Sequence, residues 1–222
     1  MTFTPLFMPQ RSSEWYQARL GRLTGSCADA ILAERKRGTG ELKARADLRR
    51  RLVCERLTGL SGEDAFETEA MRRGRDLEPL AFAAYEARTR RIVQRVGFVQ
   101  HASLMAGCSP DGYVAGPDGR WVGLIELKVP KSTTHLAYIQ GGVCPEEYVG
   151  QCQHALWLTG ADWIDFCSFD DRFDKALELF IVRVERNEAQ IADYDGKVRQ
   201  FLSELDAEVA ALQARIQQGA AA

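Results

Sequence analysis

Apolar residues recur at helical spacing in five parts of the chain. The pattern predicts helices over 13–20, 27–35, 41–58, 67–90 and 146–159. Ser12 or Ser13 is suited to cap the first of these helices, and Gly59 and Gly160 are placed to end the third and the fifth. Within the long fourth helix, Pro79 predicts either a kink or a fresh first turn.

Five other runs are rich in β-branched and aromatic residues, at 92–101, 106–116, 121–130, 163–170 and 177–185. These runs predict strands, and the turn Pro117-Asp118-Gly119 would join the second and third into a hairpin. The order is helices, then a strand meander, one helix and two more strands. It predicts an α/β or α+β domain with a mixed central β-sheet flanked by helices.

The last part of the chain predicts a long amphipathic helix over 187–217, because apolar residues recur there every three or four positions. We expect this helix to pack on the body, and a surface that faces a partner is the alternative. Residues 218–222 predict a frayed tail. At 222 residues, the chain as a whole is predicted to form a single domain over 1–222.

The distribution of charge says more than its total. The formal net charge of the chain is −2. Residues 1–100 hold 19 Lys and Arg against 13 Asp and Glu, whereas residues 101–222 hold 10 against 18. A basic half beside an acidic half fits a surface that binds a polyanion together with a carboxylate-rich site. Scattered, solvated charges are the alternative.

The sequence gives little support for a zinc, iron–sulfur or histidine-based metal site, or for a secreted or membrane protein. The six cysteines contain no C-x-x-C pair and the three histidines do not cluster, which argues against zinc, iron–sulfur and histidine-based metal sites. There is no secretory leader and no apolar run of membrane-spanning length. We therefore expect reduced thiols, no membrane partner and a cytoplasmic location.

The strand predicted at 121–130 carries a glutamate and a lysine among its apolar residues. Side chains alternate along a strand, so Ile125 and Leu127 should face the core while Glu126 and Lys128 share the opposite face. Both charged groups are costly to bury without partners. A surface ion pair between them is one explanation, and a functional site is the other.

Asp111 favours the functional explanation. It lies in "SPDG" of the preceding predicted strand, and the hairpin would fold it back toward Glu126 and Lys128. Paired carboxylates suit Mg²⁺ or Mn²⁺, which stabilise charge on a phosphoryl group and activate water. A lysine beside them could orient or deprotonate that water. Glu78, upstream on the helix predicted at 67–90, is either exposed or reaches into the same pocket.

These residues resemble a known pattern. Pro110-Asp111 followed by Glu126-Leu127-Lys128 is similar to the PD-(D/E)xK nuclease superfamily. The segments "WYQARLGRLTGS", "GRDLEPLA", "CSPDG", "ELKVP" and "YVGQCQHALWLTG" occur in the order typical of the phage lambda-type (YqaJ-like) recombination exonucleases. The resemblance extends over roughly residues 10–205.

The resemblance implies a restriction-endonuclease-like core and a Mg²⁺-dependent 5′-to-3′ exonuclease. Such an enzyme degrades one strand of linear double-stranded DNA and leaves a 3′ single-stranded tail. It also implies two Mg²⁺ ions, for which Mn²⁺ can substitute. The implied partners are DNA ends, two further copies in a homotrimer and a phage single-strand annealing protein. The implied setting is the cytoplasm of a bacterial host, with a phage or prophage gene.

Site residues follow from the resemblance position by position. The metal ligands would be Asp111, Glu126, the Leu127 backbone carbonyl and Glu78. Lys128 and Gln151 would complete the catalytic set, with Tyr148 one turn before Gln151. Arg19, Ser26 and Ser109 would hold the 5′-phosphate of the DNA.

The phosphate assignment has independent physical support. Ser26 comes just before a predicted helix, whose first N–H groups would attract a phosphate. Arg19 adds a fork-shaped cation that suits phosphate oxygens. The plainer alternatives are an ordinary helix cap for Ser26 and a surface ion pair for Arg19.

Further basic residues are candidates for contacts with the DNA backbone. Arg72, Arg73 and Arg75 lie together at the start of the long fourth helix, and residues 38–51 are also basic. We expect phosphate contacts from these arginines, and this is where we would look for residues that separate the terminal base pair. A solvated basic face is the alternative.

Three other functions compete with the exonuclease. They are a sequence-specific endonuclease of the same fold, a Cas4-like nuclease and a non-catalytic module that binds DNA ends. The lack of a cysteine cluster argues against the Cas4-like nuclease. Asp111, Glu126 and Lys128 are all present, which argues against the non-catalytic module.

Overall fold

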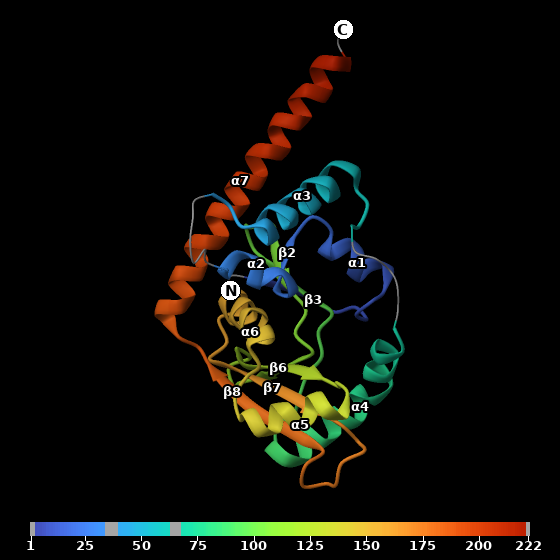
Figure 1. The fold of residues 1–222 in the computed structure, drawn as a ribbon. Helices are drawn as coiled ribbons and strands as arrows, with labels where there is room; N and C mark the ends of the chain where they lie inside the picture. The colour runs from blue at the N-terminus through green and yellow to red at the C-terminus, as the bar shows by residue number, and fades with distance from the viewer. Residues whose placement is uncertain (1–2, 34–39, 63–67, 221–222) are drawn as a thin grey trace.

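In the described part of the chain, eight strands divide between two four-stranded mixed sheets (Figure 1). The computed structural model describes residues 3–33, 40–62 and 68–220. The first sheet has the order β1 (Phe3–Leu6), β3 (Phe98–His101), β4 (Ala106–Cys108) and β2 (Leu23–Thr24). The second has the order β5 (Gly112–Ala115), β6 (Trp121–Lys128), β7 (Trp163–Phe169) and β8 (Leu179–Glu185). Each sheet contains one parallel pair, β2 with β4 and β6 with β7.

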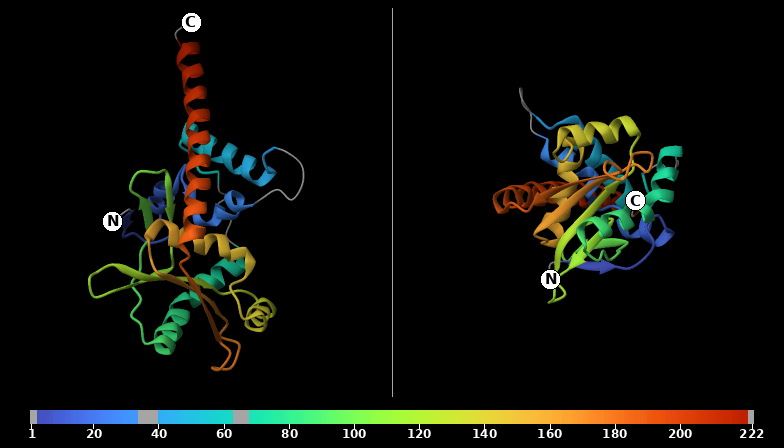
Figure 2. Two further views of the ribbon diagram at one scale, coloured as in Figure 1. Left: turned by 90° about the vertical axis from the view of Figure 1, so that its left-hand side faces the viewer. Right: turned by 90° about the horizontal axis from the view of Figure 1, so that it is seen from below.

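Helices flank both sheets, so the predicted mixed α/β class is confirmed. They are α1 (Ser13–Arg19), α2 (Ala28–Leu32), α3 (Lys43–Thr58), α4 (Glu69–Thr89), α5 (Ser132–Gly141), α6 (Glu146–Thr159) and α7 (Glu188–Ala220), with a 3-10 turn η1 at Gly25–Cys27. Figure 2 shows α4 and α6 on different faces of the second sheet.

The predicted helix ends are well reproduced. Ser12 caps α1 by accepting a hydrogen bond from the Trp15 amide. Gly59 and Gly160 end α3 and α6 in the left-handed conformation, which glycine adopts without steric cost. The helix α4 continues through Pro79 as a single element.

Several strand predictions need correction. The strand expected at 92–101 is formed only over β3. The run 106–116 is divided between β4 and β5, which belong to different sheets, and Ser109–Asp111 carries the chain from one to the other. The sequence pattern also missed β1, β2 and α5. The segment that forms α5 has no regular apolar stripe, and its buried residue is His135.

The strand β6 is covered on both faces, whereas the sequence placed a core on one face only. Ile125 and Leu127 pack with Phe82 and Tyr85 of α4 in a smaller apolar cluster. On the other face, Leu124 is fully buried in a larger cluster that includes residues of α2, α3, α6 and α7. Glu126 therefore lies in the interior, at 2% exposure.

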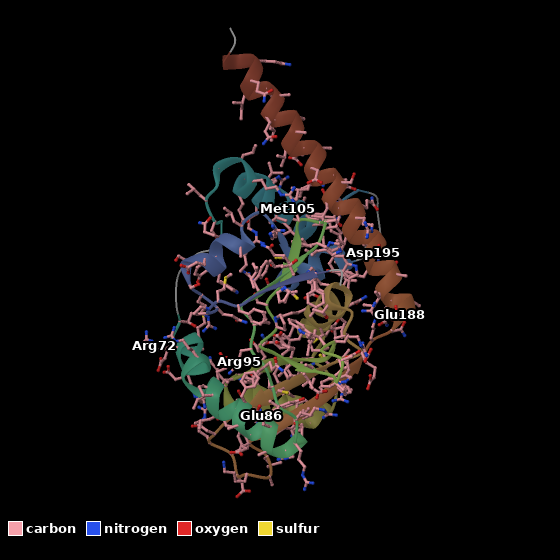
Figure 3. All side chains as sticks on the ribbon, turned by 180° about the vertical axis from the view of Figure 1, so that it is seen from behind. Arg72, Glu86, Arg95, Met105, Glu188 and Asp195 are labelled. Atoms are coloured by element: carbon pink, nitrogen blue, oxygen red, sulfur yellow. The ribbon has the colours of Figure 1, made fainter. Side chains whose placement is uncertain are left out.

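The C-terminal helix packs on the body along its first half. Tyr194, Val198 and Phe201 are fully buried, whereas Ile216 is 63% exposed. Figures 1 and 3 show α7 running past the body, with its far end at the opposite end of the molecule from α4. The helix extends over Glu188–Ala220, past the predicted end at 217, and residues 221–222 lie outside the described chain.

Candidate active site

The hairpin β5–β6 brings Asp111 opposite Glu126. The register pairs Gly112 with Ile125, so the preceding Asp111 lies beside the centre of β6. The Asp111 amide donates to the Ile125 carbonyl at 3.1 Å. The Leu127 amide donates to Oδ2 of Asp111 at 2.7 Å. Backbone and side chain are thus both held, and the predicted approach of Asp111 to Glu126 follows from the register.

Glu126 is the centre of a polar cluster inside the molecule. The Lys128 ammonium donates to Oε1 of Glu126 and forms an ion pair with it. Gln151, on α6, donates to the same oxygen through Nε2 at 2.7 Å. The Lys128 Nζ also lies 5.0 Å from the centre of the Tyr148 ring. The structure therefore brings together Lys128, Gln151 and Tyr148 around one carboxylate.

The electrostatics of this cluster favour an additional cation. Burial and the nearby Glu126 carboxylate raise the pKa of Asp111 to about 7, although Lys128 and the Leu127 amide oppose the shift. Burial disfavours the ammonium of Lys128, but the two carboxylates outweigh it and raise the pKa of Lys128. A divalent cation at this point would stabilise the ionised form of Asp111.

The donor atoms fit Mg²⁺ or Mn²⁺. The contacts above use one oxygen of each carboxylate, Oδ2 of Asp111 and Oε1 of Glu126. Oxygen ligands suit these ions, and Mg²⁺ commonly takes only one or two protein carboxylates and keeps several waters. Within the described residues, no group of three or more His, Cys, Asp and Glu gathers as a ready metal site.

Glu78 stands beside this pair and is held by an arginine. Its Oε1 accepts a hydrogen bond from Nη1 of Arg95 at 2.6 Å, and its side chain is 33% exposed. The same Arg95 nitrogen donates to the Asp111 carbonyl at 3.0 Å. The Arg95 guanidinium lies 3.5 Å from the centre of the Phe82 ring. Of the two alternatives for Glu78, the structure shows a carboxylate linked to Asp111 through Arg95.

A cleft of about 190 Å³ joins the acidic cluster to the residues expected to hold the 5′-phosphate. The cleft is lined by Arg19, Ser26, Ser109, Asp111, Glu126, Lys128 and Gln151, among others. Trp15 holds Ser109 on the side of the cleft where the 5′-phosphate is expected, because its indole Nε1 donates to Oγ of Ser109 at 2.9 Å. The Arg19 guanidinium lies 4.2 Å from the centre of the Trp15 ring.

Ser26 reaches the cleft in a different way from the one expected. It lies in η1, and its hydroxyl is 3.3 Å from Oγ1 of Thr24. The helix α2 starts only at Ala28 and has Cys27 as its N-cap, with no side-chain capping bond. The alternative that Ser26 caps this helix is therefore wrong. A tight 3-10 turn comes before the helix, and spacing alone does not reveal such a turn.

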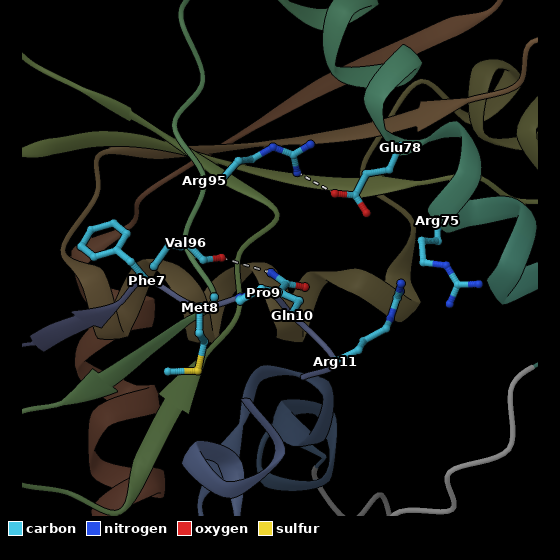
Figure 4. Close-up of a pocket in the computed structure, with 10 residues that line it drawn as sticks. Phe7, Met8, Pro9, Gln10, Arg11, Arg75, Glu78, Arg95 and Val96 are labelled. Carbon is cyan, nitrogen blue, oxygen red and sulfur yellow. Dashed lines mark hydrogen bonds and ion pairs between the residues drawn. The ribbon is translucent and has the colours of Figure 1, made fainter. Parts of the chain in front are cut away.

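The predicted basic contacts divide into two groups. Arg73 is bonded to Asp170 at 2.9 Å and to Asp171 at 2.6 Å, so it ties α4 to the loop after β7. Arg72 and Arg75 are exposed, and Arg75 lines a second, larger cleft (Figure 4).

The basic stretch 38–51 also has a largely structural role where it is described. Residues 38–39 lie outside the described chain. Arg45 and Arg49 form ion pairs with Glu204 of α7. Arg51 donates to Sγ of Cys27 at 2.9 Å. These arginines attach α3 to its neighbours, and the residues that separate the terminal base pair stay unassigned.

Sequence reasoning missed Arg95 and Trp15 as parts of the site. Arg95 belongs to an irregular segment between α4 and β3, which matches no motif quoted above. Trp15 begins the quoted segment "WYQARLGRLTGS", but no role at the site was inferred for it. Its polar ring nitrogen was the available signal, because a buried indole N–H needs an acceptor.

Comparisons with known proteins identify relatives of this chain in sequence and in fold. The sequence profile of the YqaJ-like viral recombinase domain matches residues 14–162. The alkaline exonuclease LHK-Exo from Laribacter hongkongensis is 37% identical, with a TM-score of 0.80 over 93% of this chain and 99% of that one. LHK-Exo in complex with dAMP gives 36% identity and a TM-score of 0.81 over the same shares.

Two further matches add less. A phage-related exonuclease from Haemophilus somnus is 14% identical, with a TM-score of 0.62 over 86% of this chain and 96% of that one, and shows a likeness of fold. The putative uncharacterised protein ExoD of Escherichia coli K12 is 36% identical over 59 residues, which are 27% of this chain and 67% of that protein. In the described part of the chain, no helix combines the length and apolarity needed to cross a bilayer.

Proposed function

Since the chain belongs to the family of YqaJ-like viral recombinase domains, we propose that it is a Mg²⁺-dependent 5′-to-3′ exonuclease. It would digest one strand of linear double-stranded DNA and leave a 3′ single-stranded tail for recombination. The single observation that carries the proposal is the shared cleft, which places Asp111, Glu126 and Lys128 beside Arg19 and Ser109. A hydrolytic centre and an anion pocket would lie together there.

The site residues divide the work between binding the metal and binding the strand. Asp111, Glu126 and the Leu127 carbonyl would hold Mg²⁺, with Mn²⁺ as a substitute, and the bound ion supplies charge stabilisation and a more acidic water. Lys128 and Gln151 keep Glu126 in place and offer hydrogen-bond donors to groups in the cleft. Glu78 would serve a second ion, which requires its contact with Arg95 to open.

The other side of the cleft would bind the DNA end. Arg19 offers a charged fork, and Ser26 and Ser109 offer hydroxyl groups for a terminal 5′-phosphate. The complex of LHK-Exo with dAMP supports release of mononucleotides. Each cleavage then exposes a new 5′-phosphate, which the same pocket would bind before the next cleavage.

A DNA-degradation assay tests this function. Linear duplexes labelled at either end, and closed-circular DNA, are incubated with Mg²⁺ or with a chelator. We expect loss of linear DNA alone, from the 5′ end, and only with the metal. Cutting of circular DNA would favour an endonuclease, and end binding without cleavage would favour a non-catalytic module.

Variants of the metal ligands sharpen the assay. Asp111→Asn and Glu126→Gln should abolish cleavage yet keep most DNA-end binding, because phosphate contacts elsewhere persist. Glu188→Gln is a matched control. The Glu188 carboxylate lies on the surface, and its one ion pair among the described residues is with the nearby Arg186. Cleavage within a few-fold of wild type in Asp111→Asn would contradict the metal site.

We also propose a setting for this activity. The chain would form a homotrimer around DNA, a phage single-strand annealing protein would take up the tail, and the reaction would occur in the cytoplasm of a bacterial host. The match to a family of viral recombinase domains supports this setting. Light scattering at micromolar concentration tests the trimer, and monomer alone would contradict it.

A further inference from the structure

A second cleft, of about 430 Å³, lies beside the active site and is strongly basic. It is lined by Phe7, Met8, Pro9, Gln10, Arg11, Arg75, Glu78, Arg95, Val96 and Gly97. Three arginines face one glutamate there, so the cleft favours an anion. In Figure 4 the side chains of Arg11 and Arg75 extend into the same space, one from the loop before α1 and the other from α4.

This basic cleft continues the active-site cleft. Gln10 and Arg11 line both of them. Gln10 fixes the loop, because its Nε2 donates to the Pro110 carbonyl at 3.2 Å and to the Val96 carbonyl at 3.4 Å. Pro110 immediately precedes Asp111, so Arg11 is held next to the carboxylate expected to bind the metal.

The backbone of Arg11 adds an independent observation. Its φ is 68°, in the left-handed region of backbone conformation. Residues with a side chain adopt this conformation at a cost in strain, whereas glycine adopts it freely. Among the described residues other than glycine, Arg90 at the end of α4 is the one other case of positive φ. Backbone strain concentrates at functional sites, where it fixes the direction of a side chain.

The two clefts define a path for one strand. On the proposed function, the terminal 5′-phosphate lies by Arg19 and the scissile phosphodiester lies by Asp111 and Glu126. The strand would then continue past Asp111 into the basic cleft, which Arg11 and Arg75 line. Exposed Phe7, at 69% exposure, lines the same cleft and offers an apolar surface for a base.

We propose that Arg11, together with Arg75, binds the phosphodiester that follows the scissile one in the digested strand. The inference rests on the proposed function. After each cleavage, this bound phosphodiester is the next to enter the metal site. Arg11 therefore helps to position the strand for the next turnover, in addition to the pocket that holds the 5′-phosphate.

Neutralising one phosphate at a time tests the assignment. Duplexes carry a 5′-phosphate and one uncharged methylphosphonate linkage in the digested strand, and the first hydrolysis is measured under single-turnover conditions with Mg²⁺. In the wild type, a neutral linkage between nucleotides 2 and 3 should slow hydrolysis about ten- to a hundredfold, which is typical for loss of a charged hydrogen bond. The Arg11→Gly enzyme should hydrolyse natural DNA more slowly by a similar factor. The neutral linkage should not lower its rate further.

The variants separate charge from folding. Arg11→Gly removes the side chain and also relieves the left-handed strain, so its melting temperature should equal or exceed that of the wild type. Arg11→Asn, which tolerates the same backbone, serves as a second test. Arg90→Gly is the matched control: it relieves the same strain elsewhere and should leave the response to the neutral linkage unchanged.

Two results would overturn the assignment. One is an Arg11→Gly enzyme that responds to the neutral linkage as strongly as the wild type. The other is an effect of a neutral linkage in the complementary strand that is present in the wild type and absent in Arg11→Gly. This result would show that Arg11 binds the complementary strand. A wild-type protein that hydrolyses no linear DNA contradicts the proposed function itself, so the two failures are distinguishable.

Discussion

Replacing Asp165 with alanine should destabilise the protein severely, because this carboxylate connects α4 to the sheet that carries the active site. Asp165 lies on β7 at 1% exposure. It accepts a hydrogen bond from the Tyr85 hydroxyl of α4 at 2.7 Å. Arg183 of β8 binds it through two nitrogens, at 2.8 and 2.9 Å. Its removal leaves a buried hydroxyl and a partly buried guanidinium, whose side chain is 31% exposed, without their acceptor.

The expected loss follows from these contacts. Breaking a buried ion pair by removing one partner costs about 3–5 kcal/mol. For a chain of this size, each kcal/mol lowers the melting temperature by about 2–4 °C, so a fall of roughly 6–20 °C is expected. Tyr85→Phe removes a single hydrogen bond to a charged group and should cost about 1.5–3 kcal/mol.

Urea and thermal denaturation, followed by circular dichroism, measure this loss. Asp162→Ala is a matched control, because Asp162 and Arg120 form an ion pair in which each side chain is about half exposed, at 52% and 50%. Such a pair contributes about 0–1 kcal/mol. A loss below about 1 kcal/mol for Asp165→Ala would refute the reasoning from burial.

Three further predictions concern the cleft and its support. Arg19→Ala should slow digestion of 5′-phosphorylated ends about ten- to a hundredfold and hardly alter 5′-hydroxyl ends, and equal slowing of both would remove Arg19 from the phosphate pocket. Lys128→Ala should lower the single-turnover rate more than DNA binding, and a normal rate would reduce Lys128 to an ion-pair partner. Burial lowers the pKa of His154 to about 4, below its ordinary 6.5. The unfolded chain therefore binds the extra proton first, and about 3 kcal/mol of stability is lost between pH 6.5 and pH 4. In His154→Gln, the free energy of unfolding should depend less on pH between pH 6.5 and pH 4. A pH dependence equal to that of the wild type would contradict the role of His154.

The parts of the site that were predictable depend on local geometry. A hairpin turn fixes the register of its two strands, so the approach of Asp111 to Glu126 could be inferred from the sequence between them. Gly59 and Gly160 ended their helices as expected, because glycine alone adopts the left-handed cap without strain.

The rest of the site depends on packing between distant segments. Gln151 reaches Glu126 from a helix 25 residues away, and Trp15 reaches Ser109 across 94 residues. No periodicity encodes such contacts, and only the family resemblance placed Gln151 there. The single core face expected for β6 failed for a related reason. A parallel partner strand and helices on both sides bury the whole strand, and this environment is set by the fold.

The cost of burying charge explains how the second sheet is built around β6. On one face, Glu126 is compensated by Lys128 and Gln151. On the face toward α4, Asp165 is compensated by Tyr85 and Arg183. Both carboxylates are almost fully buried, so each would strongly disfavour folding without its partners. The two clusters differ in one respect. Asp165 is satisfied by its own contacts, whereas burial and the neighbouring Glu126 raise the pKa of Asp111, so a cation beside Asp111 would stabilise its ionised form. Asp111 and Glu126 line the cleft, where the proposed metal ion and DNA strand would reach them.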